Sequence, residues 1–184
     1  MTPGFNEKKA TQLAGLLLKM RGQGYMSYMK LIKLMYLIDR QALLRWGWSM
    51  TGDTYSSLKN GQILSITYDL VRDRIWGKGD YWKQFVSPPH GDKEVSLIKE
   101  PETSELSRAD IGLAEEVFAE FGKLGRFEIA DYTHSLPEYR KTEGPSLPVG
   151  YADVLEKVGH RSHVEIEKIL DELHGLAQLE SLTL

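Results

Sequence analysis

The stretch Lys30-Leu-Ile-Lys-Leu-Met-Tyr-Leu-Ile-Asp39 decides the fold of this chain. We expect it to form the middle of a helix that is capped by Ser27 and ends near Trp46. At about 100° per residue, its aliphatic side chains fill one broad arc of the helix. The narrower and more polar arc holds Lys30, Lys33, Leu37, Arg40 and Gln41. A helix with so little polar surface is predicted to lie at the centre of the molecule.

Asp39 projects into the apolar arc, between Met35 and Leu43. A carboxylate in such surroundings is costly unless a cation, a hydroxyl or backbone N–H groups lie beside it. We expect backbone donors, or a lysine near the turn at residues 59–61, to satisfy it.

Further helices are predicted on both sides of the central one. Apolar periodicity and helix-start signals indicate helices over about 6–21, 63–75, 107–124, 127–135, 151–158 and 162–174. Ser107 with Asp110, and Ser162 with Glu165, have the spacing of capping pairs. Residues 84–87 and 94–99 are expected to form an antiparallel hairpin, the only clear β pairing.

These elements predict a mainly α fold, a compact bundle of about five to seven helices around a buried central helix, with one small β-hairpin. The chain has 184 residues, which fits one domain over 1–184 with a core at about 10–160 and a C-terminal helix at about 162–174. The N-terminus lacks the apolar segment of a signal peptide and no stretch is long enough to span a bilayer, so we expect a cytoplasmic protein.

Composition also limits the chemistry. The chain contains no cysteine, which excludes disulfides, zinc–thiolate sites, iron–sulfur clusters and thiol nucleophiles. The five histidines do not have metal-ligand spacing, and no glycine-rich stretch has a complete phosphate-binding pattern. We therefore expect neither a metal nor another cofactor.

Charge is distributed unevenly along the chain. Residues 1–92 carry 13 Lys and Arg against 7 Asp and Glu, whereas residues 93–184 carry 10 against 19. Either the two halves attract each other within one domain, or one of them forms a charged face for a partner.

A basic, aromatic cluster in the first half suggests nucleic-acid binding as an alternative function. The sequence pI near 6.0 and the lack of a helix-turn-helix pattern argue against it. Its candidate residues are Arg72, Arg74, Trp76 and Lys78. A third possibility, a small hydrolase, would use Asp131 and His134, which share a helix face but have no identifiable nucleophile beside them.

The stretch at residues 30–39 resembles the K-L-x-K-L-x-Y-x-x-D helix of the Panacea domain, the SocA-like antitoxin family. Other landmarks follow in the family's order and bring the resemblance to about residues 10–160. They are Gly47, Asp53, Leu58-Lys-Asn-Gly61, Ser107-Arg-Ala-Asp-Ile, Phe121-Gly-Lys-Leu and Ile129-Ala-Asp-Tyr-Thr-His-Ser. The chain departs from the family pattern at Leu58 and Asn60, where aromatic residues are usual, at Gln62, which replaces a proline, and at Tyr139, where a tryptophan is common.

The resemblance implies an antitoxin of a bacterial or phage toxin–antitoxin system. Such a protein binds and neutralises a protein toxin encoded by an adjacent gene and is not an enzyme. Apart from the resemblance, a homo-oligomer of this chain is a further possible partner. The positions that match family landmarks, and are thus candidates for partner binding, are Lys33, Tyr36, Asp39, Lys59, Gly61, Asp131 and His134. Each also has a purely structural explanation, such as an interior hydrogen bond for His134 near Asp131. The alternative function remains a nucleic-acid-binding transcriptional regulator.

Overall fold

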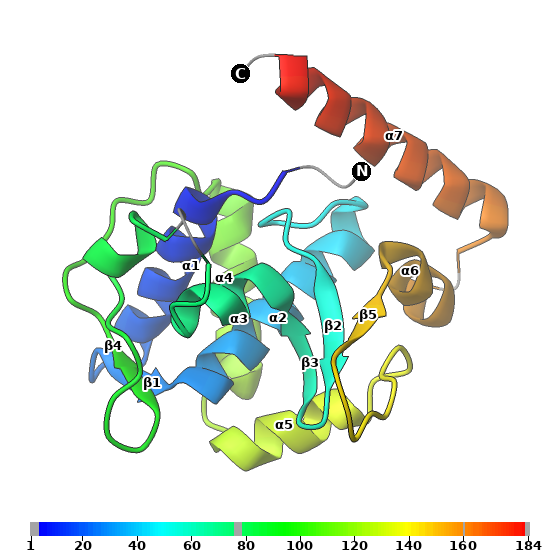
Figure 1. The fold of residues 1–184 in the computed structure, drawn as a ribbon. Coiled ribbons are helices and arrows are strands. Elements are labelled where there is room, and N and C mark those ends of the chain that lie inside the picture. Colours follow the sequence, from blue (N-terminus) through cyan, green and yellow to red (C-terminus); the bar gives the residue numbers. More distant parts are fainter. Residues whose placement is uncertain (1–3, 76–78, 160, 183–184) are drawn as a thin grey trace.

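The structure, a computed structural model, describes residues 4–75, 79–159 and 161–182. Helix α2 (Tyr28–Trp46) runs through the middle of the molecule, and 13 of its 19 residues are buried. A short helix, α3 (Ser65–Val71), touches it, and four longer helices pack against it (Figure 1). They are α1 (Glu7–Met20), α4 (Arg108–Phe121), α5 (Arg126–His134) and α6 (Tyr151–Gly159). The predicted mainly α fold around a buried central helix is therefore confirmed.

The remaining elements are short, apart from the last helix. They are α3 (Ser65–Val71), the 3₁₀ turn η1 (Trp82–Gln84), α7 (His163–Leu182) and the strands β1 (Tyr25–Ser27), β2 (Tyr55–Leu58), β3 (Gly61–Leu64), β4 (Glu94–Ser96) and β5 (Leu147–Val149). Strands β1 and β4 form one antiparallel pair, and β2 lies between β3 and β5 in an antiparallel sheet of three strands.

Most of the predicted helix starts are confirmed. The Asn6 side chain accepts a hydrogen bond from Lys9 N at 2.8 Å, and Ser107 and Asp110 form a reciprocal capping box. Ser27 is at the N-cap position of α2 but makes no side-chain capping bond, so that detail of the prediction is wrong. The reason is that Ser27 ends strand β1, and Tyr28 N donates to Lys93 O, next to β4, at 2.9 Å.

The predicted strands are partly wrong. Strand β4 pairs with β1. The predicted arms at 84–87 and 94–99 meet antiparallel at a single bridge between Val86 and Leu97, where Ser87 N donates to Ser96 O at 2.9 Å and Ile98 N donates to Phe85 O at 2.7 Å. The 3₁₀ turn η1 keeps the first arm from extending. The hairpin of β2 and β3 was not predicted, and the helix expected over 63–75 spans only Ser65–Val71. All four residues of β3 are buried, so the strand lacks the alternation that would identify it.

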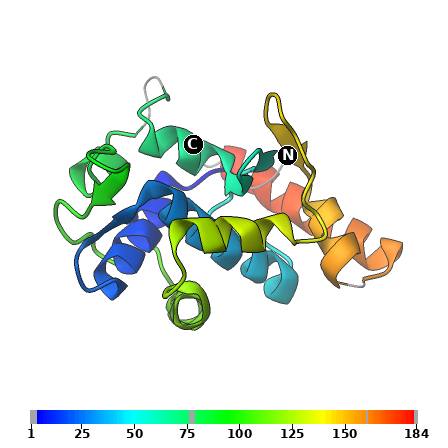
Figure 2. The same cartoon turned by 90° about the horizontal axis from the view of Figure 1, so that it is seen from below.

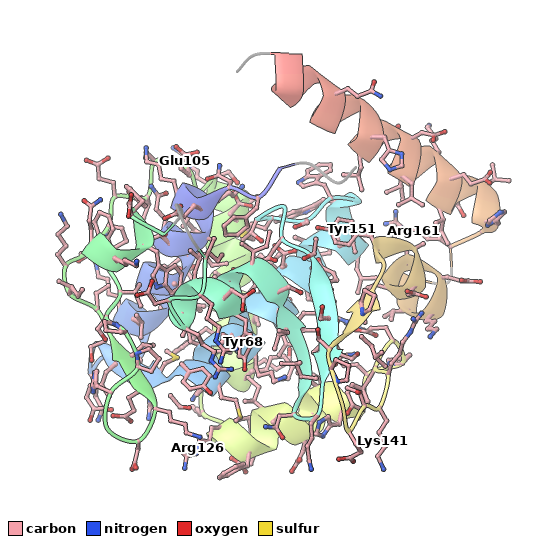
Figure 3. The ribbon with its side chains drawn as sticks, viewed as in Figure 1. Tyr68, Glu105, Arg126, Lys141, Tyr151 and Arg161 are labelled. Atoms are coloured by element: carbon pink, nitrogen blue, oxygen red, sulfur yellow. The ribbon has the colours of Figure 1, made fainter. Side chains whose placement is uncertain are left out.

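Helix α7 continues beyond its predicted end at residue 174 to Leu182. It lies beside α6 and projects past the rest of the molecule (Figure 1). Ile166 and Leu173 are buried among the α7 side chains that the structure describes. Arg161, labelled in Figure 3, donates to Leu44 O at 2.7 Å just before α7 begins. No helix in the described part of the chain is long and apolar enough to cross a membrane.

Ion pairs within the molecule join the basic first half to the acidic second half. Among the described residues, six ion pairs join a basic side chain before residue 93 to an acidic one after residue 92. They are Lys8–Glu105, Lys9–Asp110, Lys19–Glu100, Arg40–Glu138, Arg45–Glu116 and Lys59–Glu143. The halves thus attract each other within the fold, as one of the two interpretations predicted.

Candidate functional site

Five of the seven candidate residues meet where the tip of the β2–β3 hairpin contacts α2 and α5. Lys33 Nζ on α2 donates to Gln62 O at 2.6 Å, and His134 Nε2 on α5 donates to Lys59 O at 3.0 Å. Gly61 lies at the turn between these contacts, and Asp131 lies one helical turn before His134. We call this region the hairpin-tip site.

Gly61 allows the hairpin to approach α5 closely. Its φ of +89° lies in the left-handed region, which favours glycine. A Cβ at this position would lie 2.2 Å from Thr133 Oγ1 and 3.0 Å from Lys33 Nζ. The tip therefore has no room for any side chain at residue 61.

His134 joins α5 to the hairpin. Its Nδ1 is 3.9 Å from Asp131 Oδ1, and the Asp131 side chain is 84% exposed, which makes this a loose pair. The imidazole also lies against the Tyr139 ring, with centroids 4.8 Å apart. No hydroxyl group of the described residues hydrogen-bonds to His134, so the geometry adds no nucleophile to the hydrolase hypothesis.

Lys33 is the most unusual group of the site. Only 2% of the residue is exposed, and Gln62 O is its single hydrogen-bond acceptor among the residues that the structure describes. Burial lowers the pKa of Lys33 to about 7, because the ammonium loses its hydration shell. A pocket of about 230 Å³ opens beside it, between α2, the hairpin and α3.

Tyr36 and Asp39 lie deeper along α2 and expose no surface. The Tyr36 hydroxyl donates to Glu138 Oε1 at 2.8 Å, and Arg40 Nε donates to the same oxygen at 2.6 Å. These two candidates can therefore support a partner surface only by holding the fold in place.

Asp39 has the partners that its position in the apolar arc requires. Thr51 N and Thr51 Oγ1 each donate to Asp39 Oδ1 at 2.8 Å, and the Tyr55 hydroxyl donates to Oδ2 at 2.6 Å. Burial raises the pKa of Asp39, while these hydrogen bonds act in the opposite direction. The expected backbone donor is present, but no lysine from the turn at 59–61 hydrogen-bonds to Asp39.

Two buried acidic residues, Glu138 and the family landmark Asp53, were not among the seven candidate site residues. Glu138 binds Arg40 and Tyr36 from the chain after α5, and no periodic pattern marks such a position. Asp53 accepts hydrogen bonds from Ile66 N and Thr67 N, both at 2.8 Å, and so holds the start of α3. Burial raises the pKa of Asp53 to about 6.

Helix α5 presents an exposed face beside the hairpin tip. Phe127 is 65% exposed and Tyr132 is 38% exposed, and two acidic side chains, Glu128 and Asp131, lie on the same face. The opposite face, with Ile129, Ala130 and Thr133, is buried. Figure 2 shows α5 running across the molecule on the side from which it is viewed. We call the exposed residues Phe127, Glu128, Asp131 and Tyr132 the α5 face.

Of the four candidate residues for nucleic-acid binding, two lie in the described part of the chain. Arg72 and Arg74 are exposed, and the Arg72 guanidinium lies 5.2 Å from the centre of the Tyr68 ring. Asp73 lies between the two arginines in sequence and forms an ion pair with Lys83 at 2.6 Å, which reduces the local positive charge. Trp76 and Lys78 lie outside the described residues, so this alternative stays a prediction.

Within the described part of the chain, no three His, Asp or Glu side chains come together in a way that could hold a metal ion.

The comparison with protein families agrees with the landmarks in the sequence. The family model described as "Antitoxin SocA-like, Panacea domain" matches residues 31–139. This range contains all seven candidate residues and the α5 face. Comparison with curated proteins gave no match, and comparison with solved structures gave none either.

Proposed function

The chain belongs to the SocA-like antitoxin family with the Panacea domain, and from this membership we propose that it neutralises a cognate protein toxin by binding it directly. The toxin would be encoded by an adjacent gene in a bacterial or phage genome, and the two proteins would meet in the cytoplasm. The observation that carries the proposal is the family match over residues 31–139, which spans most of the central helix, the hairpin and α5.

We propose that the α5 face and the hairpin tip contact the toxin. Aromatic side chains that are exposed in the free protein are frequent anchors of protein interfaces. Phe127 and Tyr132 are two such residues on one short helix, and both lie within the matched range. His134 and Gly61 fix this helix against the hairpin, so the surface is rigid before the toxin arrives.

The charge of this surface suggests the chemistry of its partner. Glu128 and Asp131 are exposed between the two aromatic residues, so a toxin surface with lysine or arginine side chains would complement them. Arg126, labelled in Figure 3, lies with its guanidinium 5.0 Å from the centre of the Phe127 ring, at the start of the same helix.

We further propose that the protein acts by binding and not as an enzyme. This view is supported by the loose pairing of Asp131 with His134, and by the hydrogen bond that commits His134 Nε2 to Lys59 O. A catalytic base needs a ring nitrogen within hydrogen-bonding distance of a nucleophile or substrate.

The proposal is tested by bacterial growth. The adjacent reading frame is expressed from an inducible promoter, with and without co-expression of this chain. We expect growth arrest that co-expression relieves, and a stable complex in size-exclusion chromatography, whose mass also gives the number of copies of each chain. Arrest that co-expression does not relieve, or no arrest, would contradict the proposal.

Salt dependence separates the antitoxin from the nucleic-acid alternative. A complex with nucleic acid loses affinity steeply as salt rises, because binding releases counterions condensed on the nucleic acid and this release is less favourable in concentrated salt. The affinity of a complex with an aromatic core changes much less. Titration of duplex DNA at two salt concentrations, with wild type and with Arg72→Ala/Arg74→Ala, would reveal the alternative.

A further inference from the structure

Three cations on α2 are buried, and their surroundings differ. Arg40 is neutralised by Glu138, whose two carboxylate oxygens accept from Nε at 2.6 Å and from Nη2 at 3.2 Å. Lys30 donates to a backbone carbonyl, Gly122 O, at 2.6 Å. Lys33 likewise has only a backbone carbonyl, Gln62 O, although an ammonium group offers three N–H donors. Within the described part of the chain, no carboxylate forms an ion pair with either lysine.

Lys33 differs from Lys30 in what lies beside it. Only 2% of Lys33 is exposed, and it lines the pocket of about 230 Å³ next to the hairpin. The walls of this pocket are mainly apolar and aromatic, and none of the lining residues is acidic. The residues that line it are Tyr28, Met29, Ile32, Lys33, Leu58, Lys59, Asn60, Gly61, Ile63, Tyr68 and Gly144.

We infer that this pocket binds a carboxylate attached to an apolar group, with Lys33 as the cation that receives it. The apolar group would fill the space between Met29, Ile63 and Tyr68, and the carboxylate would supply the anion that the protein does not provide. Asn60 adds an amide to the lining, while the charge of Lys59 is balanced by Glu143 at 3.1 Å.

The size of the pocket limits the ligand to a small one. Pockets for drug-sized molecules typically have volumes of about 300–1,000 Å³. This pocket, at about 230 Å³, suits a group about as large as one apolar amino-acid residue. The lowered pKa of Lys33 agrees with a cation that lacks a counter-ion.

Two sources offer this chemistry: a free organic acid, and the last residue of a polypeptide that ends in an apolar side chain. The inference is independent of the proposed function, because it rests on the pocket and Lys33 alone. Toxin neutralisation and ligand binding can therefore fail separately.

Isothermal titration calorimetry of the full chain with N-acetyl-leucine at pH 6, below the pKa of Lys33, tests the inference. The matched control ligand is N-acetyl-leucinamide, which has the same shape without the charge. We expect the acid to bind at least about tenfold more tightly than the amide, because a charge-assisted hydrogen bond is lost in the amide. Lys33→Met should remove this preference, whereas Lys83→Met, a lysine outside the pocket, should keep it.

A second pair of variants covers the case in which Lys33→Met does not fold. A Cβ at Gly144 meets no atom within 4 Å, so Gly144→Trp can place a large side chain at the edge of the pocket without a clash at the backbone. Gly112 on α4 is equally open and lies outside the pocket. We expect Gly144→Trp to weaken binding of the acid at least about tenfold, as a blocked pocket requires, and Gly112→Trp to leave it unchanged.

Two further ligands identify the source of the carboxylate. Binding of 4-methylpentanoate together with rejection of a tetrapeptide ending in free leucine would indicate an organic acid. Binding of the tetrapeptide acid, but not of its amide, would indicate a polypeptide terminus. Equal binding of N-acetyl-leucine and its amide, no binding of either, or undiminished binding to both Lys33→Met and Gly144→Trp would overturn the inference.

Discussion

At the scale of single residues, the buried ammonium of Lys33 makes the free energy of unfolding depend on pH. The pKa of Lys33 is lowered from 10.5 to about 7, so between these values the folded protein holds a neutral amine while the unfolded chain is protonated. The unfolded state then binds more protons, and stability rises with pH across this window. The free-energy cost of burying the charged Lys33 ammonium is complete below pH 7 and absent above pH 10.5.

We therefore predict that wild type gains stability relative to Lys33→Met as pH rises from 7 to 10. The gain is at most about 1.4 kcal/mol per pH unit. Urea denaturation of both proteins at several pH values measures it, and the difference between the two removes the other titrating groups. A difference that stays constant over this range would show that Lys33 titrates normally.

The polar residues of α2 also show how far the sequence can predict a site. Asp39 was predicted to be buried because it lies within an apolar arc, and its hydroxyl and backbone partners were of the expected kinds. Lys33 and Arg40 lie on the arc of the helix that the sequence predicts to be more polar, yet both are buried. Helical periodicity gives the direction of a side chain but not the element that covers it, and here β3 and Glu138 come from distant parts of the chain.

At the scale of secondary-structure elements, the contact between the hairpin tip and α5 depends on the missing side chain of Gly61. Helices were predictable because caps and periodicity are local signals. The pairing of β1 with β4 joins Met26 to Val95, and no local signal encodes a contact between segments so far apart. The β2–β3 turn contains Asn60-Gly61, a dipeptide typical of tight hairpins, but the prediction placed a helix after it and missed the hairpin. The close approach of the turn to α5 became visible only in the structure.

Gly61→Ala is predicted to destabilise the protein strongly. The new Cβ would meet Thr133 Oγ1 at 2.2 Å, in addition to the strain of a positive φ. Gly22→Ala is the matched control, because Gly22 has a φ of +79° and open space around it. We expect a loss of about 1 kcal/mol for Gly22→Ala from strain alone, and at least about 2 kcal/mol more for Gly61→Ala. Equal losses, measured by urea denaturation, would mean that the tip can move away from α5.

Phe127→Ala tests the α5 face. Its side chain is 65% exposed, so we expect little change in melting temperature but at least about tenfold weaker binding of the toxin, as for an interface anchor. Val164→Ala on α7 is the control, since Val164 is 73% exposed and lies outside the family match. Surface plasmon resonance with the purified toxin gives both affinities. Unchanged affinity in the double variant Phe127→Ala/Tyr132→Ala would place the toxin elsewhere.

At the scale of the whole molecule, the basic first half and the acidic second half hold each other together through ion pairs of unequal depth. Arg40–Glu138 is buried, with side-chain exposures of 6% and 0%, whereas Lys19–Glu100 is exposed. A buried charge without its partner is strongly destabilising, while an exposed pair is screened by water and salt.

We predict that Glu138→Gln lowers the free energy of unfolding by about 3–5 kcal/mol, because it leaves the Arg40 guanidinium buried without a counter-charge. Glu100→Gln should change it little. The loss in Glu138→Gln should also be nearly the same in 0.05 and 0.5 M NaCl, a range over which exposed pairs weaken. Similar small effects of both substitutions would show that Arg40 reaches water in the native state.

The central position of α2 has a consequence for how the protein folds while it is synthesised on the ribosome. Helix α2 is finished at Trp46, but α6, one of the helices that cover it, begins only at Tyr151. At about 5–20 residues per second, synthesis of the intervening hundred or so residues takes roughly 5–20 s. During that time helix α2, with 13 of its 19 residues buried in the folded protein, lacks part of its covering. On the proposed function, neutralisation of the toxin by the fully covered fold would begin only after α6 has been synthesised.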